Sequence, residues 1–168
     1  VYDEACSYAL RLAEENGYTF IHPFDDLDVA TGQGSIAMEI IKELPTVDII
    51  LVPIGGGGLA SGVSTLVKVL NPNIKVIGVE PAGANCMEVS LKEGHVVTLP
   101  KVETIADGTA VKTPGSKIFP YIKENIDDVF YKPISQIAKE SNIGEATITR
   151  FVKKMNFNGL QDFKVTLA

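Results

Sequence analysis

Two hydrophobic patterns separated by glycines form the clearest feature of this sequence. Residues 46–54 are almost all apolar and rich in β-branched side chains, which is typical of a strand buried on both faces of a parallel sheet. Four consecutive glycines follow. Small and apolar residues then recur at helical spacing: Leu59, Gly62, Val63, Leu66, Val67 and Leu70. The patterns predict a buried strand, a tight turn and a helix.

The same two patterns alternate over most of the chain. Helices are predicted over 3–16, 59–70, 85–92 and 116–124, and a further helix is predicted to begin after its cap at Ser35. Strands are predicted over 18–21, 46–54, 74–79 and 128–131. Residues 24–34 are expected to form a loop or a broken helix. Strands that alternate with helices are typical of right-handed βαβ units. The predicted fold class is therefore α/β, with a parallel sheet flanked by helices.

The glycine run has a chemical interpretation as well as a conformational one. Backbone N–H groups at the start of a helix have no partner within the helix, and the helix dipole favours an anion there. A phosphate is therefore the predicted ligand of Gly55, Gly56, Gly57, Gly58 and Leu59, although a tight turn alone also requires glycine. No lysine follows Gly58, so the run is not a phosphate loop of the G-x-x-x-x-G-K-[ST] type.

Other polar residues follow predicted strands, where ligands bind in open α/β sheets. His22 follows the first predicted strand and Glu80 follows the strand over 74–79. A hydrogen-bonded loop residue is the simpler interpretation of His22. A solvated loop likewise explains Asp25, Asp26 and Asp28, because their spacing is not that of a calcium loop.

The amino-acid composition is that of a globular protein. The chain has 168 residues, of which 45% are hydrophobic and 21% charged, which are values of a globular protein. No apolar stretch is long enough to span a membrane. Cys6 and Cys86 lack the spacing of metal ligands, and reduced thiols in a cytoplasmic protein are expected. Since Val1 precedes a helical pattern directly, we expect the sequence to be an excerpt of a longer one.

Charge divides the chain into two parts. Residues 1–128 carry nine Lys and Arg against eighteen Asp and Glu, for a net charge of −9. Residues 129–168 carry six against three, for a net charge of +3. A polyanionic partner would therefore bind the C-terminal part.

Five blocks in residues 1–128 resemble those of a known family. In chain order they are FIHPFDD at 20–26, ATGQGSI at 30–36, VPIGGGGL at 52–59, GVEP at 78–81 and ETIADG at 103–108. This series resembles the threonine dehydratase and serine racemase group of fold-type II pyridoxal-phosphate enzymes, with threonine dehydratase the more similar. The blocks do not decide between threonine and serine as substrate.

The resemblance implies site residues and ligands. It implies that Gly55, Gly56, Gly57, Gly58 and Leu59 surround the phosphate of pyridoxal 5′-phosphate, and that Gly108 lies beside the cofactor ring. It also implies a small amino-acid substrate and a homo-oligomer. In cation-dependent members, the positions of Glu80 and of the Ala84 carbonyl bind a divalent ion together with a further carboxylate. Cys86 takes the place of that carboxylate, and a thiol is a poor ligand for magnesium or calcium.

Other parts of the family pattern are not found in this sequence. The Schiff-base lysine of the family lies in an S-x-K-x-R-G block, and these 168 residues contain no such block. The loop that binds the substrate carboxylate and the residue that hydrogen-bonds the pyridine nitrogen are absent too. The lysine supplies covalent attachment and the general base. The expectation is a fragment of a threonine/serine dehydratase (ammonia-lyase) that is catalytically inactive alone and can retain phosphate affinity.

Residues 129–168 predict a different kind of structure. Two short helices, 134–141 and 145–155, are separated by a tight turn at Asn142. The blocks ISQIAKES, EATITRF and FNGLQDFK resemble the helix-turn-helix of the RpiR family of phosphosugar-responsive transcriptional regulators, although its leading helices and sugar-phosphate domain are missing. The resemblance implies DNA contacts from the outward side of the second helix: Thr147, Thr149, Arg150, Lys153 and Lys154. A plain helical hairpin that closes the α/β domain is the alternative.

The predicted organisation is therefore an α/β fragment over 1–128 joined to a partial helix-turn-helix over 129–168. The join can be a natural fusion, a misassembled gene or an engineered hybrid. Three functions remain open: an incomplete pyridoxal-phosphate lyase, a sequence-specific DNA-binding regulator carrying a passive α/β part, and a structural piece completed by a partner chain.

Overall fold

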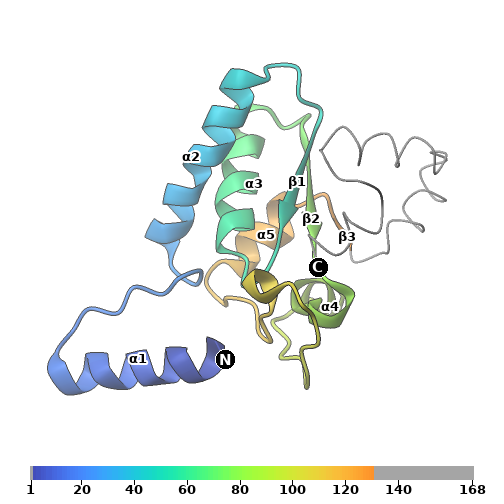
Figure 1. Cartoon of the computed structure of the whole chain (residues 1–168). Coiled ribbons are helices and arrows are strands. Elements are labelled where there is room, and N and C mark those ends of the chain that lie inside the picture. The colour runs from blue at the N-terminus through green and yellow to red at the C-terminus, as the bar shows by residue number, and fades with distance from the viewer. Residues whose placement is uncertain (1, 131–168) are drawn as a thin grey trace, which may run out of the picture.

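The computed structural model describes residues 2–130, which form several helices and a small sheet (Figure 1). The elements in chain order are α1 (Tyr2–Asn16), α2 (Leu27–Glu43), β1 (Ile49–Pro53), α3 (Gly58–Leu70), β2 (Lys75–Val79), η1 (Ala82–Ala84), α4 (Cys86–Glu93), η2 (Asp107–Thr109), α5 (Phe119–Asn125) and β3 (Asp128–Phe130). Residues 129–168 were predicted to form a helix-turn-helix. From 131 on, that segment lies outside the described residues, as do Thr147, Thr149, Arg150, Lys153 and Lys154.

The sheet confirms the predicted α/β class with parallel strands. Its three described strands lie in the order β1-β2-β3, and both neighbouring pairs are parallel. Leu51 of β1 pairs with Ile77 of β2, which in turn pairs with Asp128 of β3. Helix α3 packs against the sheet, and α2 and α5 pack against α3. All three strands therefore end on the same side of the molecule, where parallel sheets bind ligands.

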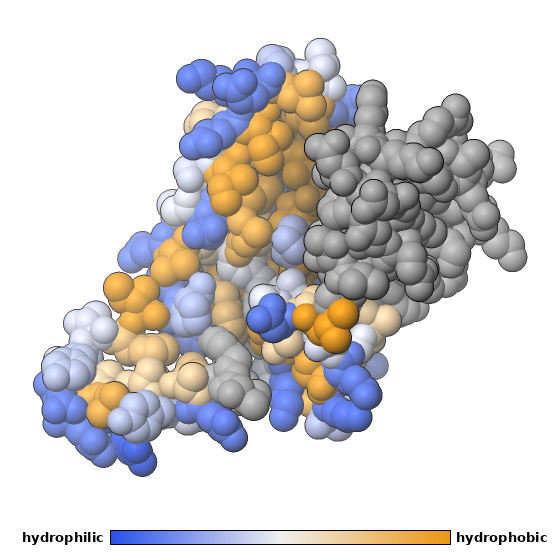
Figure 2. All heavy atoms as spheres, in the orientation of Figure 1, coloured by the Kyte–Doolittle hydropathy of each residue, from blue (hydrophilic) through white to orange (hydrophobic). Residues whose placement is uncertain are grey.

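Burial of β1 differs from the prediction. Ile50 and Val52 are buried, whereas Ile49 and Leu51 are 52% and 64% exposed. The strand is thus covered on one face only in the described part of the chain, because the helices that contact the sheet there pack on that face. Apolar side chains are visible over α2, α3 and β1 in Figure 2.

The N-terminal segments also differ from the prediction. Residues 18–21 form no strand, because no strand lies beside them in the described range, and Ile21 is 67% exposed. Helix α2 begins at Leu27 rather than after Ser35, since the Asp26 carboxylate caps it by accepting the amides of Asp28 and Val29 at 2.9 and 3.0 Å. Helix α1 lies apart from the other elements in Figure 1, and none of residues 4–16 is buried.

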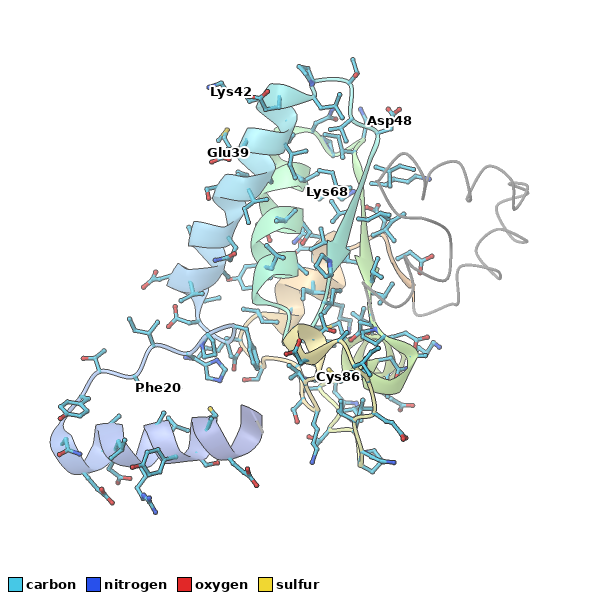
Figure 3. All side chains as sticks on the ribbon, viewed as in Figure 1. Phe20, Glu39, Lys42, Asp48, Lys68 and Cys86 are labelled. Carbon is cyan, nitrogen blue, oxygen red and sulfur yellow. The ribbon has the colours of Figure 1, made fainter. Side chains whose placement is uncertain are left out.

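An ion pair ties the end of α3 to the start of β3. The Lys68 Nζ lies 2.8 Å from the Asp127 carboxylate, and the same carboxylate accepts the Val76 amide at 2.7 Å. Partial burial opposes ionisation of Asp127, but these hydrogen bonds outweigh it and hold the pKa of Asp127 below its usual value. Lys68, labelled in Figure 3, belongs to α3.

We expect Asp127→Asn to lower the free energy of unfolding by about 1 kcal/mol at neutral pH, a value reduced by the partial exposure of the pair. A lowered folded-state pKa contributes stability above the unfolded value of 3.8, and this contribution is lost as the pH falls through the folded value. The variant and the wild type should therefore converge at acid pH in urea unfolding. Asp48→Asn, at an exposed position, is the control. A deficit for Asp127→Asn that persists unchanged at acid pH would contradict the expectation.

No helix within the described range is both long enough and apolar enough to cross a membrane.

Candidate functional site

A cavity of about 430 Å³ lies where β1 ends and α3 begins. Three separate parts of the chain form its wall: Pro23, Phe24 and Gln33; Pro53, Gly55, Gly56, Gly57, Gly58 and Leu59; and Asp107, Gly108, Thr109, Ala110 and Val111. The structure thus brings together the glycine run, Leu59 and Gly108, which the family resemblance implies to surround one cofactor. Phe24 and Gln33 line the same cavity, although no sequence pattern predicts them there.

Glycine is required in this loop by both conformation and space. Gly57, the residue before α3, has φ +106°, in the region that L-residues avoid. A Cβ on Gly56 would lie 2.2 Å from Cδ2 of Phe24. The loop therefore passes close beneath an aromatic ring, and a side chain at Gly56 would not fit without displacing that ring.

The carbonyl groups of the loop are bonded within the protein, but its amides are not. Gly56 O accepts the Gly115 amide at 2.9 Å, and Gly57 O accepts the Ser61 amide at 2.9 Å. In the described part of the chain, no hydrogen bond uses the amide of Gly55, Gly56, Gly57, Gly58 or Leu59 as donor. Unbonded amides at the start of a helix form the donor set that fits a phosphate.

Glu80 and Cys86 lie beside this loop. The two carboxylate oxygens of Glu80 accept the amides of Met87 and Glu88 at 2.9 and 2.8 Å, at the start of α4. Cys86 Sγ lies 3.9 Å from Gly55 O and 4.0 Å from Glu80 Oε1, and Figure 3 labels Cys86 near the carboxyl ends of the strands. Burial raises the pKa of Glu80 to about 7 and that of Cys86 to about 12, with the Glu80 charge adding to the shift of Cys86.

The metal prediction for Glu80 and Ala84 stays a prediction. Ala84 ends η1 and is buried, and the Glu80 oxygens bond the two amides of α4. Among residues 2–130, no group of three or more His, Cys, Asp or Glu side chains is arranged to hold a metal ion.

The raised pKa of Glu80 predicts a pH-dependent stability. Between pH 4.5 and about 7, the folded protein keeps a proton on Glu80 that the unfolded chain has released, so the free energy of unfolding falls as the pH rises through this window. We expect this fall, on the order of 3 kcal/mol, to be absent in Glu80→Gln and present in the exposed control Glu93→Gln. Urea unfolding across the window measures it. An equal pH dependence in Glu80→Gln and wild type would contradict the assignment.

The remaining polar residues singled out in the sequence make hydrogen bonds within the protein. His22 Nδ1 accepts the amides of Phe24 and Asp25 at 3.3 and 2.9 Å, in agreement with a hydrogen-bonded loop residue. The Asp26 carboxylate caps α2, and the Asp25 carboxylate accepts the Lys117 amide at 2.7 Å. Of these contacts, only the one between Asp25 and Lys117 joins segments far apart in sequence, so local patterns could not reveal it.

Comparison with known proteins assigns this arrangement to a family. Residues 1–140 match the family model described as "Pyridoxal-phosphate dependent enzyme", a span that runs past the predicted boundary at 128. The L-threonine ammonia-lyase of Geobacter sulfurreducens is 46% identical over 137 residues, which are 82% of this chain and 34% of that protein. The biosynthetic L-threonine dehydratase of Pasteurella multocida is 40% identical over 173 residues, covering 94% of this chain and 34% of that protein.

Solved structures agree with the sequence comparison. The processed form of threonine deaminase isoform 2 from Solanum lycopersicum has a TM-score of 0.74 at 47% identity, covering 77% of this chain and 38% of that chain. Maize serine racemase has a TM-score of 0.70 at 39% identity, covering 76% and 40%. The chain therefore spans about a third of the length of the curated relatives it matches.

Proposed function

Because this chain belongs to the pyridoxal-phosphate dependent enzymes, we propose that its glycine loop binds the phosphate of pyridoxal 5′-phosphate and that the chain is part of an L-threonine ammonia-lyase. Pyridoxal phosphate is the cofactor of the family. The proposed substrate is a small hydroxy amino acid, as the names of the relatives suggest.

The unbonded amides of the loop carry this proposal. The amides of Gly55, Gly56, Gly57, Gly58 and Leu59 have no acceptor in the described part of the chain, and all five residues line one cavity. A buried donor left without an acceptor costs roughly 1–3 kcal/mol. A phosphate would satisfy several such donors at once and would be stabilised by the dipole of α3.

The residues of this chain would hold and orient the cofactor. The loop amides would bind the phosphate, and Gly108, which lines the same cavity, leaves space beside the cofactor ring because nothing lies within 4 Å of a Cβ built on it. When bound, the cofactor supplies an electron sink for a carbanion at the substrate α-carbon. None of the described residues that line the cavity is lysine.

Binding of pyridoxamine 5′-phosphate tests the cofactor assignment. This analogue has no aldehyde, so it cannot react with surface lysines. We expect saturable binding in isothermal titration calorimetry, and binding at least tenfold weaker for pyridoxamine, which lacks the phosphate. Equal affinity for the two compounds, or no binding of either, would overturn the proposal.

A hybrid enzyme tests the proposed activity. The chain can be joined to the rest of the Geobacter sulfurreducens ammonia-lyase, outside the 34% of that protein that it matches, and ammonia release from L-threonine and L-serine compared. We expect release from L-threonine to be the faster. The intact ammonia-lyase is the positive control, and a folded hybrid with no activity toward either amino acid would contradict the proposal.

DNA binding through residues 147–154 remains a separate prediction. A mobility shift that weakens with salt and with Arg150→Ala would support it. A shift unchanged by that variant would argue against readout by the second predicted helix.

A further inference from the structure

A short turn beside the cavity is held together by a histidine ring. His22 Nδ1 accepts the Asp25 amide at 2.9 Å and the Phe24 amide at 3.3 Å. A ring nitrogen that accepts two N–H groups carries no proton, so the arrangement requires the tautomer with its proton on Nε2. The His22 side chain is half-buried, and its edge meets the Phe24 ring at a centroid distance of 4.6 Å and an angle of 82°.

The turn presses one aromatic ring onto the glycine loop. Phe24 lines the cavity together with Gly55–Gly58. Cβ atoms built on Gly56 and Gly58 would lie 2.2 Å from Phe24 Cδ2 and 2.8 Å from Phe24 Cα. Phe24 is therefore in close contact with the backbone that carries the unbonded amides, and its position limits where those amides can lie.

The same turn is anchored on its other side. The Asp25 carboxylate accepts the Lys117 amide at 2.7 Å and the Ser116 hydroxyl at 3.1 Å. The neighbouring Gly115 amide donates to Gly56 O at 2.9 Å. Two sets of contacts therefore link the His22 turn to the glycine loop. One runs through Asp25 and Gly115, and the other runs through Phe24.

We propose that His22 is a positioning residue for the phosphate-binding amides: its unprotonated Nδ1 fixes the turn that holds Phe24 and Gly115 against the glycine loop. This inference rests on the proposed function, because the ligand is the cofactor phosphate. His22 itself does not line the cavity, so it acts through Phe24 and Asp25 and not by touching the ligand.

Three substitutions separate the Nδ1 acceptor from the bulk of the ring. His22→Ala removes the acceptor. His22→Asn places an amide oxygen near the position of Nδ1, whereas His22→Gln places it near Nε2. We expect the affinity for pyridoxamine 5′-phosphate to fall about tenfold in His22→Ala and His22→Gln and to stay within about threefold in His22→Asn. Affinity for pyridoxamine should not change in any variant.

The outcomes distinguish this inference from the proposed function. If the wild type shows no phosphate-dependent binding, the proposed function fails first, and the inference falls with it. If the wild type binds and all three variants bind equally well, the inference alone is wrong. Should His22→Ala not fold, the comparison of His22→Asn with His22→Gln decides, since the two variants carry the same amide acceptor and one methylene group shifts its position.

A spectroscopic measurement tests the tautomer independently of binding. In a nitrogen-15 NMR spectrum of the histidine rings, assigned with His22→Asn, we expect the His22 Nδ1 signal of an unprotonated nitrogen at neutral pH. The exposed His95 provides the reference ring. A protonated Nδ1 in His22 would overturn the inference, because it could not accept the Phe24 and Asp25 amides.

Discussion

Gly62→Ala is expected to lower the free energy of unfolding by about 3 kcal/mol or more, a large effect for the addition of a single methyl group. A Cβ on Gly62 of α3 would lie 2.0 Å from the carbonyl oxygen of Ala30 and 2.9 Å from the Gly34 amide, both in the backbone of α2. Backbone atoms cannot rotate out of the way as a side chain can. The two helices would therefore have to separate, which would expose the apolar contacts between them.

Gly32→Ala is the matched control, because it makes the same chemical change in α2. Gly32 is exposed, and nothing lies within 4 Å of a Cβ built on it. Alanine favours a helix over glycine by about 1 kcal/mol, so this variant should be slightly more stable than the wild type. Urea unfolding of the three proteins measures the effects. A loss below about 1 kcal/mol in Gly62→Ala would show that α2 and α3 do not pack as closely as described.

The sequence predicted the elements that are marked by a local pattern of residues. β1, α3 and β2 appear within a few residues of their predicted positions, because each is marked by its own hydrophobic period and by glycine or proline at its ends. The capping of α2 was missed because Ser35 and Asp26 are both good caps. The choice of Asp26 places Gly34 within α2, where a Cβ would lie 3.3 Å from Gly62 O. Both residues are locally acceptable as the N-cap of α2, and the packing of α2 against α3 favours Asp26.

Part of the site was predictable because a local pattern marks it. Its glycine run is contiguous, so the chemistry of its amides follows from a short stretch of sequence. Residues 107–111 and the ring of Phe24 reach the cavity from segments that are distant along the chain. Only the resemblance placed Gly108 there. The role of His22 depends on a single ring nitrogen, which no sequence pattern specifies.

The loss of one amide should have the largest effect on cofactor binding. Leu59 is the second residue of α3, and its N–H is among the unbonded donors of the loop. Leu59→Pro removes this N–H at a position where proline is compatible with a helix. A hydrogen bond to a charged group contributes roughly 1.5–3 kcal/mol, so the affinity for pyridoxamine 5′-phosphate should fall by about 10- to 100-fold.

Leu59→Ala separates the loss of the amide from the loss of the side chain, which packs against the core. Both variants lose the leucine, but only Leu59→Pro loses the donor. The expected result is therefore near-normal phosphate-dependent binding in Leu59→Ala and strongly weakened binding in Leu59→Pro, measured by calorimetry on proteins with matching circular dichroism spectra. Since pyridoxamine lacks the phosphate, its binding should respond equally to the two substitutions. Equal affinities of the two variants for pyridoxamine 5′-phosphate would mean that the Leu59 amide does not contact the phosphate.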